Sequence, residues 1–179
     1  KEAREFNQAN YQLLFDFSDG IPEGWDYDGP GTTEIVARGD FQILPAGGQF
    51  VESLFLPGVA TSAISSRFNA ALRSPFLKTI ETVHVSVLSA GGDHSAFRRV
   101  IDNAFLTEKQ TYFNSPRYQW KVMSTSKGME HRRIFYEMAT KTSNPNFPPR
   151  VGLGEKLTDE QMENPRSWFA VNKILGQEG

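Results

Sequence analysis

Hydrophobic and polar residues alternate with a period of two over residues 82–88, which places valines on one side and polar residues on the other. Successive side chains of a strand point to opposite faces, and β-branched residues favour the pleated backbone. The pattern therefore predicts a half-buried strand whose valine side packs against a second apolar layer. The valine side consists of Val83, Val85 and Val87. Residues expected to form the facing layer are Phe97, Val100 and Phe105.

Shorter apolar runs, separated by clusters of Gly, Pro and Asp, predict further strands along most of the chain. These strands are expected at residues 13–17, 34–37, 40–44, 50–56, 97–106, 117–123 and 131–140. Gly91-Gly92-Asp93 predicts the turn that ends the valine strand, because glycine tolerates positive φ. Regularly spaced short strands indicate an antiparallel sandwich rather than βαβ units.

The two ends of the chain are predicted to be helical. Residues 1–12 contain good helix formers with apolar side chains on one face. Near the C-terminus, Thr158-Asp159-Glu160-Gln161 fits a capping box, and Asn164-Pro165 supplies an N-cap followed by proline. The apolar side of this tail would consist of Trp168, Phe169, Val171, Ile174 and Leu175.

We therefore predict a mostly β fold: an antiparallel jelly-roll β-sandwich with short N- and C-terminal helices. The whole chain, residues 1–179, is expected to form a single domain. Its parts would be an N-terminal helix (residues 1–12), the sandwich (residues 13–154) and a helical tail (residues 155–179).

Composition narrows the classes of function. The chain has 179 residues, no cysteine and a formal charge of −2 with scattered basic residues. It therefore offers no disulfide or thiolate site, and its charge argues against a nucleic-acid partner. No apolar run approaches the roughly 18 residues of a membrane span. Because the first residue is Lys1, we expect the chain to be an excised or processed piece of a longer protein.

An aromatic and acidic loop is the main candidate for binding. Residues 18–33 are rich in Gly, Pro and Asp and contain Trp25 and Tyr27. The apolar CH face of a sugar ring packs well on an aromatic plane, and carboxylates accept hydrogen bonds from its hydroxyls. The predicted ligand-binding residues are Trp25, Asp26, Tyr27, Asp28 and Tyr112. A place in the core is an equally good interpretation of Trp25, and Trp120 and Trp168 are predicted to be core residues.

Two other kinds of chemistry compete for the same acidic residues. Asp16 and Asp19 are candidate ligands of a structural Ca²⁺, which prefers several hard oxygen ligands; no other cofactor is expected. A glycoside hydrolase needs two carboxyl groups roughly 5–9.5 Å apart. Residues that could belong to such a pair are Asp16, Asp26, Asp28 and Glu137. Acidic residues in Gly-rich loops more often make turns and caps, so the chain is not expected to be an enzyme.

Several short motifs carry a resemblance to a known family. The unit Leu72-Arg73-Ser74-Pro75-Phe76, followed by a strand ending in Gly91-Gly92, resembles the galactose-binding-like β-sandwich modules attached to glycoside hydrolases. Phe15-Asp16-Phe17 and Gly24-Trp25 match the opening strand and loop of those modules, and Gln119-Trp120-Lys121-Val122 matches a later strand. The chain is also similar to the middle, non-haem segment of large planctomycete multidomain proteins that carry cytochrome-c-like modules.

The resemblance implies a sugar-binding-type domain without catalysis, in an exported parent that is periplasmic, on the cell surface or secreted. Our leading hypothesis is a carbohydrate-binding accessory module whose partners are a polysaccharide or glycan and the neighbouring domains of the same chain. The alternative is a structural interdomain spacer with no ligand of its own, and a glycoside hydrolase ranks third. An exposed Trp25 in a concave polar patch would favour sugar binding, and a Trp25 packed under the N-terminal helix would favour the spacer.

Overall fold

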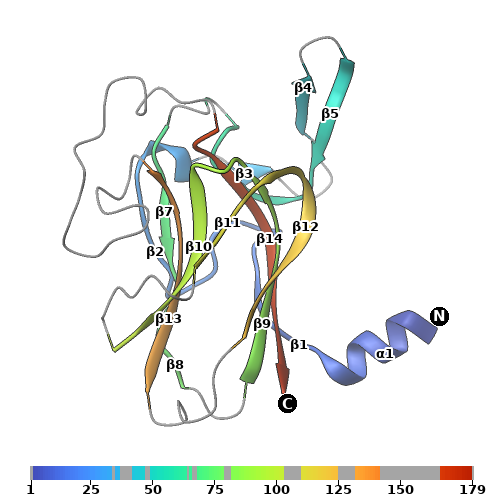
Figure 1. Ribbon diagram of the computed structural model, residues 1–179, viewed down its shortest axis with the longest axis vertical. Helices are drawn as coiled ribbons and strands as arrows, with labels where there is room; N and C mark the ends of the chain where they lie inside the picture. The colour runs from blue at the N-terminus through green and yellow to red at the C-terminus, as the bar shows by residue number, and fades with distance from the viewer. Residues whose placement is uncertain are drawn as a thin grey trace.

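The computed structural model shows two antiparallel sheets packed face to face, with one helix at the N-terminus (Figure 1). It describes residues 2–33, 35–36, 42–46, 49–63, 65, 68–78, 82–102, 110–124, 132–141 and 166–178. The predicted antiparallel β-sandwich is therefore confirmed. The predicted N-terminal helix is present as α1 (Glu2–Asn10). No helix of the described residues is long and apolar enough to cross a membrane.

Sheet A contains the valine strand in its interior. Its strand order is β12-β9-β14-β6-β3, and β1 pairs with β14 beside this path. The bounds are β1 (Gln12–Asp16), β3 (Ile35–Val36), β6 (Gly58–Ala60), β9 (Thr82–Gly91), β12 (Ser115–Ser124) and β14 (Phe169–Glu178). The valine strand, β9, lies between β12 and β14 in the interior of the sheet.

Sheet B has the order β11-β10-β13-β7-β2, and β8 pairs with β13 beside this path. The bounds are β2 (Asp26–Asp28), β7 (Ala71–Arg73), β8 (Leu77–Lys78), β10 (Ser95–Ile101), β11 (Gln110–Tyr112) and β13 (Arg133–Thr140). A separate hairpin is formed by β4 (Gln42–Ala46) and β5 (Gln49–Phe55), and Pro30–Thr32 forms a short 3₁₀ turn. Strand β11 was not predicted, since residues 107–116 had the composition of a loop.

The main core lies between the two sheets. Val85 and Val87 of β9 are buried there together with Phe97 of β10, as predicted. Val100 is also buried, but it lies on the opposite face of β10 from Phe97, because the two residues are three apart in a strand. Phe105 and the side chain of Val83 lie outside the described residues.

The C-terminal tail is the largest difference from the predicted fold. Over residues 169–178 the predicted helix is wrong, since these residues form β14, which pairs with β9, β6 and β1. The register of β14 shifts between Val171 and Lys173. Such a bulge adds one residue, so Val171 and Ile174, three apart, both reach the core. This spacing imitates the apolar stripe of a helix. The capping residues from Thr158 to Pro165 lie outside the described residues.

The glycine pair after β9 has a different role from the predicted one. Neither Gly91 nor Gly92 has positive φ, and Gly91 is the last residue of β9. A Cβ on Gly92 would lie 1.9 Å from the Arg166 carbonyl oxygen, and one on Gly91 would lie 2.6 Å from Phe113 Cβ. Glycine is needed here because the neighbouring chain comes very close, and the turn to β10 follows it.

A second, smaller cluster covers part of the outer face of sheet A, meaning the face turned away from sheet B. Trp168 is buried in this cluster, as predicted, with its ring 5.5 Å from that of Phe55 and edge-on to it. The cluster contains Val36, Phe55, Ala60, Ala90, Trp168 and Ala170. Trp120 lies beyond it and is 45% exposed, so the prediction that Trp120 is a core residue is wrong.

Candidate functional site

Trp25 does not present its ring to solvent. It is 6% exposed, and its ring centroid lies 5.1 Å from that of Phe15 and 4.9 Å from that of Phe17, both edge-on. The indole Nε1 is buried without a hydrogen-bond partner. Trp25 is therefore a core residue, and the predicted stacking of a sugar on it is wrong. Its cover is Phe15 of β1 and the adjoining Phe17, not the N-terminal helix.

The other predicted ligand-binding residues lie on sheet B. Tyr27 is 58% exposed on β2, which forms one edge of the sheet. Asp26 and Asp28 flank it on this strand, both exposed. Tyr112 lies on β11 at the opposite edge and is half-buried. Three strands separate Tyr112 from Tyr27, so the structure does not bring these two residues together.

Four charged residues form a continuous row across sheet B. The strand register places Asp26 opposite Arg73, Arg73 opposite Glu137, and Glu137 opposite Arg98. Arg73 donates from Nη1 to Asp26 Oδ2 at 3.2 Å and from Nε to Glu137 Oε2 at 2.7 Å. Arg98 donates from Nη2 to the remaining oxygen of Glu137, Oε1. We call Asp26, Arg73, Glu137 and Arg98 the charged row.

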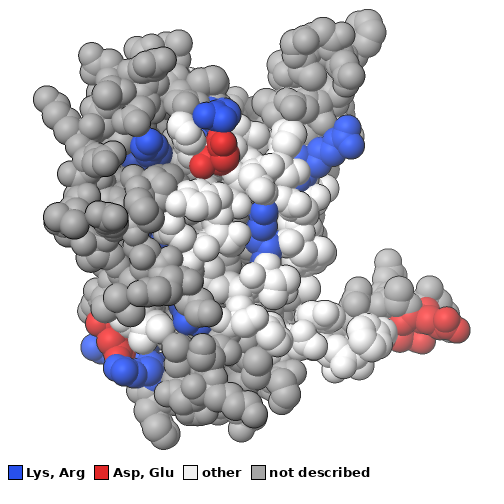
Figure 2. Space-filling view, in the orientation of Figure 1, with Lys and Arg blue, Asp and Glu red and all other residues white. Residues whose placement is uncertain are grey.

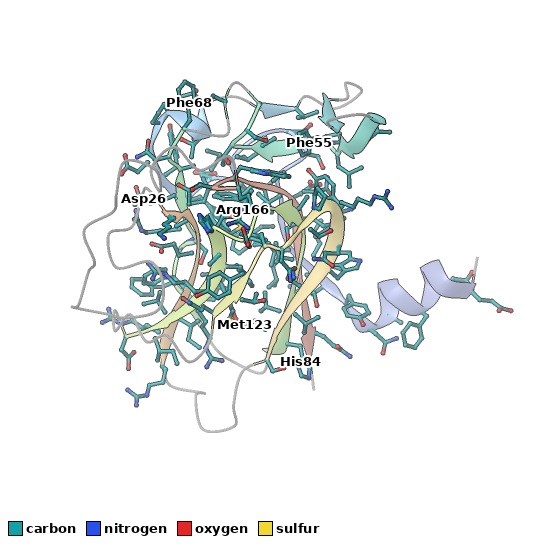
Figure 3. The ribbon with its side chains drawn as sticks, turned by 45° about the horizontal axis from the view of Figure 1, so that its top comes forward. Asp26, Phe55, Phe68, His84, Met123 and Arg166 are labelled. Atoms are coloured by element: carbon teal, nitrogen blue, oxygen red, sulfur yellow. The ribbon has the colours of Figure 1, made fainter. Side chains whose placement is uncertain are left out.

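The charged row is buried at its centre and open at the β2 edge. Glu137 is 1% exposed, Arg73 is partly buried, and the Asp26 side chain is 75% exposed. Burial acts to lower the pKa of Arg73, but the carboxylates of Glu137 and Asp26 outweigh it and raise that pKa above its usual value. The buried end therefore holds the guanidinium in place, and the Asp26 carboxylate meets it at the surface (Figure 3).

Aromatic side chains adjoin the same face of sheet B. Phe76 is exposed, and Phe135 lies edge-on to it with ring centroids 5.6 Å apart. The guanidinium carbon of Arg133 lies 5.2 Å from the centre of the Phe76 ring. Phe135 and Glu137 are two apart on β13 and share a face of the strand, so these aromatics border the charged row.

A single serine fixes the segment that carries both Arg73 and Phe76. The Ser74 backbone N–H donates to the Tyr136 carbonyl oxygen at 2.8 Å, and the Tyr136 N–H donates to Ser74 Oγ at 2.9 Å. Neither Arg73 nor Phe76 was predicted to bind a ligand. The signal was present in the Leu72–Phe76 unit that carries the family resemblance, but an isolated arginine gives no indication of its partners.

Tyr112 closes the far end of the same face. Its hydroxyl oxygen accepts a hydrogen bond from Gln110 Nε2 at 2.8 Å, and Gln110 lies opposite Arg98. Burial raises the pKa of Tyr112, and the hydrogen bond from Gln110 opposes this only in part. Tyr112 therefore remains a neutral hydroxyl at the far edge, separated from the exposed end of the row.

The predicted Ca²⁺ ligands lie elsewhere. Asp16 Oδ1 accepts a hydrogen bond from the Ser18 N–H at 2.9 Å, the kind of local bond by which Asp shapes a turn. Asp19 is exposed nearby. Within the described ranges, no three His, Cys, Asp or Glu side chains gather in a group that could hold a metal ion. A Ca²⁺ site at Asp16 and Asp19 stays a prediction.

The carboxylates considered for hydrolysis are tied to arginine. Asp26 and Glu137 bind the same guanidinium, that of Arg73, and both oxygens of Glu137 accept from arginines. Each oxygen of this buried carboxylate is already an acceptor for a guanidinium group. Glu137 therefore serves as a structural anchor of the row.

Comparisons with known proteins give weak likenesses of fold. No protein-family model matches the chain, and no curated protein sequence matches it. A GH26-CBM35 β-(1,4)-mannanase of Podospora anserina matches 95% of this chain at 8% identity and a TM-score of 0.39. The chain spans 28% of that protein's length.

Two further solved structures are similar over most of their own length. The K3 cleaved adhesin domain of Lys-gingipain from Porphyromonas gingivalis has a TM-score of 0.44 and 8% identity, covering 93% of this chain and 100% of the domain. The low-affinity xylan-binding module CBM86 of Roseburia intestinalis has a TM-score of 0.36 and 8% identity, covering 87% of this chain and 96% of the module. At such values the function has to be inferred from this chain's own residues.

Proposed function

We propose that this chain is a non-catalytic glycan-binding accessory module, and that its ligand binds at the exposed end of the charged row. Asp26 and Arg73 meet at the β2 edge of sheet B, and the exposed ring of Tyr27 lies at the same edge on the other side of the strand. The site therefore combines a fixed acceptor, a fixed donor and aromatic surface, which are the groups that a sugar ring needs for recognition.

The chemistry suits neighbouring hydroxyls of a sugar. A hydroxyl both donates and accepts, so one can donate to the Asp26 carboxylate while the next accepts from the Arg73 guanidinium. Tyr27 alternates to the other side of β2 from Asp26, so a ligand contacting both lies along the strand edge. Phe76 adds a second exposed ring on the face of the charged row.

The observation that carries the proposal is the buried anchoring of an exposed ion pair. An ordinary ion pair on the surface loses side-chain entropy when its geometry is fixed, so it contributes little to folding stability. Here Glu137 holds Arg73 from the buried side at 2.7 Å, so less ordering remains to be done when a ligand binds. A preorganised donor and acceptor at a surface edge are what a weak polar ligand requires.

The proposal is tested by measuring retention of the 179-residue chain in native gels that contain each member of a panel of soluble polysaccharides. At least one glycan should retard the wild type. Asp26→Asn and Tyr27→Ala should each weaken that binding about tenfold, since each removes a charged acceptor or a stacking surface. Trp120→Ala is the matched control, because Trp120 is an exposed aromatic residue on sheet A.

Two results would overturn the proposal: no retardation on any glycan, or a loss of binding with Trp120→Ala while the sheet B variants bind normally. Circular dichroism should show all three variants folded, because each changed side chain is exposed on the surface. The exported parent and the extracytoplasmic location stay predictions that accompany this proposal.

The structural spacer remains the second candidate, and one observation favours it. The outer face of sheet A carries exposed Trp120 and Val122 on β12 and exposed Leu13 on β1, with β9 and β14 between these strands. Aliphatic side chains suit a protein surface better than a hydroxyl-rich ligand. A chain that binds no glycan, together with a neighbouring domain of the parent that binds this face, would support the spacer.

A further inference from the structure

Part of the outer face of sheet A carries exposed apolar side chains. The cluster around Phe55 and Trp168 covers one part of this face. Further along the same strands, the register aligns Val122 with Ser86, Leu175 and Leu13 in one row, and Trp120 with Leu88 in the next. Val122 is 57% exposed. We call Leu13, Leu88, Trp120, Val122 and Leu175 the apolar stripe.

Helix α1 has an exposed apolar side chain of its own. It stands away from the two sheets, on the side of the body opposite Asp26 (Figures 1 and 3). Phe6 is 61% exposed. A helix of nine residues is marginal on its own in water and gains stability mainly by packing an apolar face. Both α1 and the apolar stripe therefore lack apolar cover within the described part of the chain.

The connection to β1 keeps α1 from reaching the stripe of its own molecule. Tyr11 is the only residue between the end of α1 at Asn10 and the start of β1 at Gln12. Laying the helix back over the sheet requires the chain to reverse direction, and even a tight turn has two central residues between its ends. The helix is therefore presented outward, away from the strand that carries Leu13.

We propose that the outer face of sheet A binds α1 of a second copy of this chain, in a reciprocal twofold dimer. A helix of nine residues is about 13.5 Å long, close to the three spacings of about 4.8 Å that separate the four strands of the stripe. In a twofold pair the contact occurs twice, which doubles the buried apolar area. Phe6 of each copy lies on the stripe of the other.

Charge agrees with this pairing. The first turn of α1 carries Glu2 and Glu5, and its last turn has no basic residue, as the red tip in Figure 2 shows for the acidic end. Lys173 lies opposite Leu88, at the border of the stripe. Asp16 of β1 lies opposite Lys173 on its other side, so the acidic helix end is favoured toward Lys173 and away from Asp16, which orients the contact. The charged row lies on the other sheet, so the dimer leaves the proposed glycan site open.

A crosslinking experiment tests the pairing directly, since the chain has no cysteine of its own. Phe6→Cys protein is mixed with ¹⁵N-labelled Val122→Cys protein, oxidised mildly and analysed by intact mass. The disulfide-linked heterodimer should exceed both homodimers, because α1 of one copy meets the stripe of the other. Absence of the heterodimer, or an excess of either homodimer, would overturn the proposal.

The double variant Phe6→Cys/Val122→Cys separates the second copy from the chain's own helix. Oxidation should give dimers crosslinked between copies; a monomer with an internal disulfide would refute the proposal. Sedimentation velocity over a concentration series completes the test. The wild type should dimerise, and Phe6→Asp should weaken dimerisation about tenfold or more. Tyr27→Asp, a charge placed on the other sheet, should leave it unchanged. A wild type that is monomeric throughout overturns the proposal.

Discussion

The outer faces of the two sheets differ in chemistry: the face of sheet B is charged and the face of sheet A is apolar. Sheet B carries charges across its outer face, and each one from Asp26 to Arg98 has a partner on the next strand. Sheet A carries apolar side chains, of which one part is covered by Phe55 and another part, around Trp120, is exposed. A charge that is paired with an opposite charge can be buried within one molecule. Exposed apolar surface contributes to stability only when another surface covers it.

The largest expected effect on stability comes from neutralising Glu137, the buried carboxylate that anchors the charged row. Glu137→Gln should lower the free energy of unfolding by about 3 to 5 kcal/mol, because the buried guanidinium of Arg98 loses its counter-charge. Urea unfolding measures this change. Asp26→Asn removes the exposed carboxylate of the same row and should cost less than about 1 kcal/mol.

Equal and small effects of the two substitutions would contradict the burial of the row. They would mean that water reaches Glu137 and that the exposed ion pair lacks a fixed anchor. The proposed glycan site would then lose the preorganisation on which it depends, so this stability measurement also tests the binding proposal.

Two tryptophans on sheet A distinguish its covered and open parts. Trp168→Phe should cost about 1 to 2 kcal/mol, because a smaller ring leaves a cavity against Phe55. Trp120→Phe should change stability by less than about 0.5 kcal/mol, because the ring is already in contact with water. Thermal and urea unfolding measure both variants. A larger cost for Trp120 than for Trp168, at concentrations where the chain is monomeric, would show that the stripe is covered within one copy of the chain.

The sequence predicted the sandwich because its central strand is regular. Strand β9 sends Val85 and Val87 into the core with strict alternation, which is the clearest signal that a strand can give. Strand β14 was missed because its bulge places Val171 and Ile174, three apart, on the inner face. Local periodicity reports the face of a strand only where the register is unbroken.

The tryptophans show a second limit. The alternation in β12 correctly grouped Trp120 with Val122 on one side, but it does not say which side faces the core. That side faces outward, and Met123 of the opposite side is buried. The Gly and Pro neighbours of Trp25 indicate a loop and left its place in the core undecided, and Phe15 and Phe17 cover it.

The candidate site could be predicted only in part. Asp26, Asp28 and Tyr27 were identified from their loop, and they are exposed on β2. Their partnership with Arg73 and Glu137 depends on the pairing of β2 with β7 and of β7 with β13. These strands are far apart in sequence, and no local pattern encodes which of them become neighbours in a sheet.

The smallest expected effect concerns the turn that joins the two sheets. His94 follows β9 of sheet A and precedes β10 of sheet B, and its Nε2 lies 3.3 Å from Nη2 of Arg166. Arginine can only donate, so the imidazole accepts and is neutral. Burial lowers the pKa of His94, and the charges of Lys141 and Arg166 lower it further against the opposing effect of Asp93.

The sign of the pH dependence follows from this lowered pKa. In the unfolded chain the imidazole takes up a proton as pH falls through about 6.5, while in the folded chain it resists protonation. Stability from this group is therefore complete above about pH 7 and declines as pH falls toward 5. His94→Gln, which keeps a neutral acceptor for Arg166, should flatten this decline in urea unfolding at several pH values. His84→Gln, a histidine within β9, serves as the control. If His94→Gln keeps the full wild-type slope, His94 does not sense pH and the joint between the sheets is held by its backbone hydrogen bonds alone.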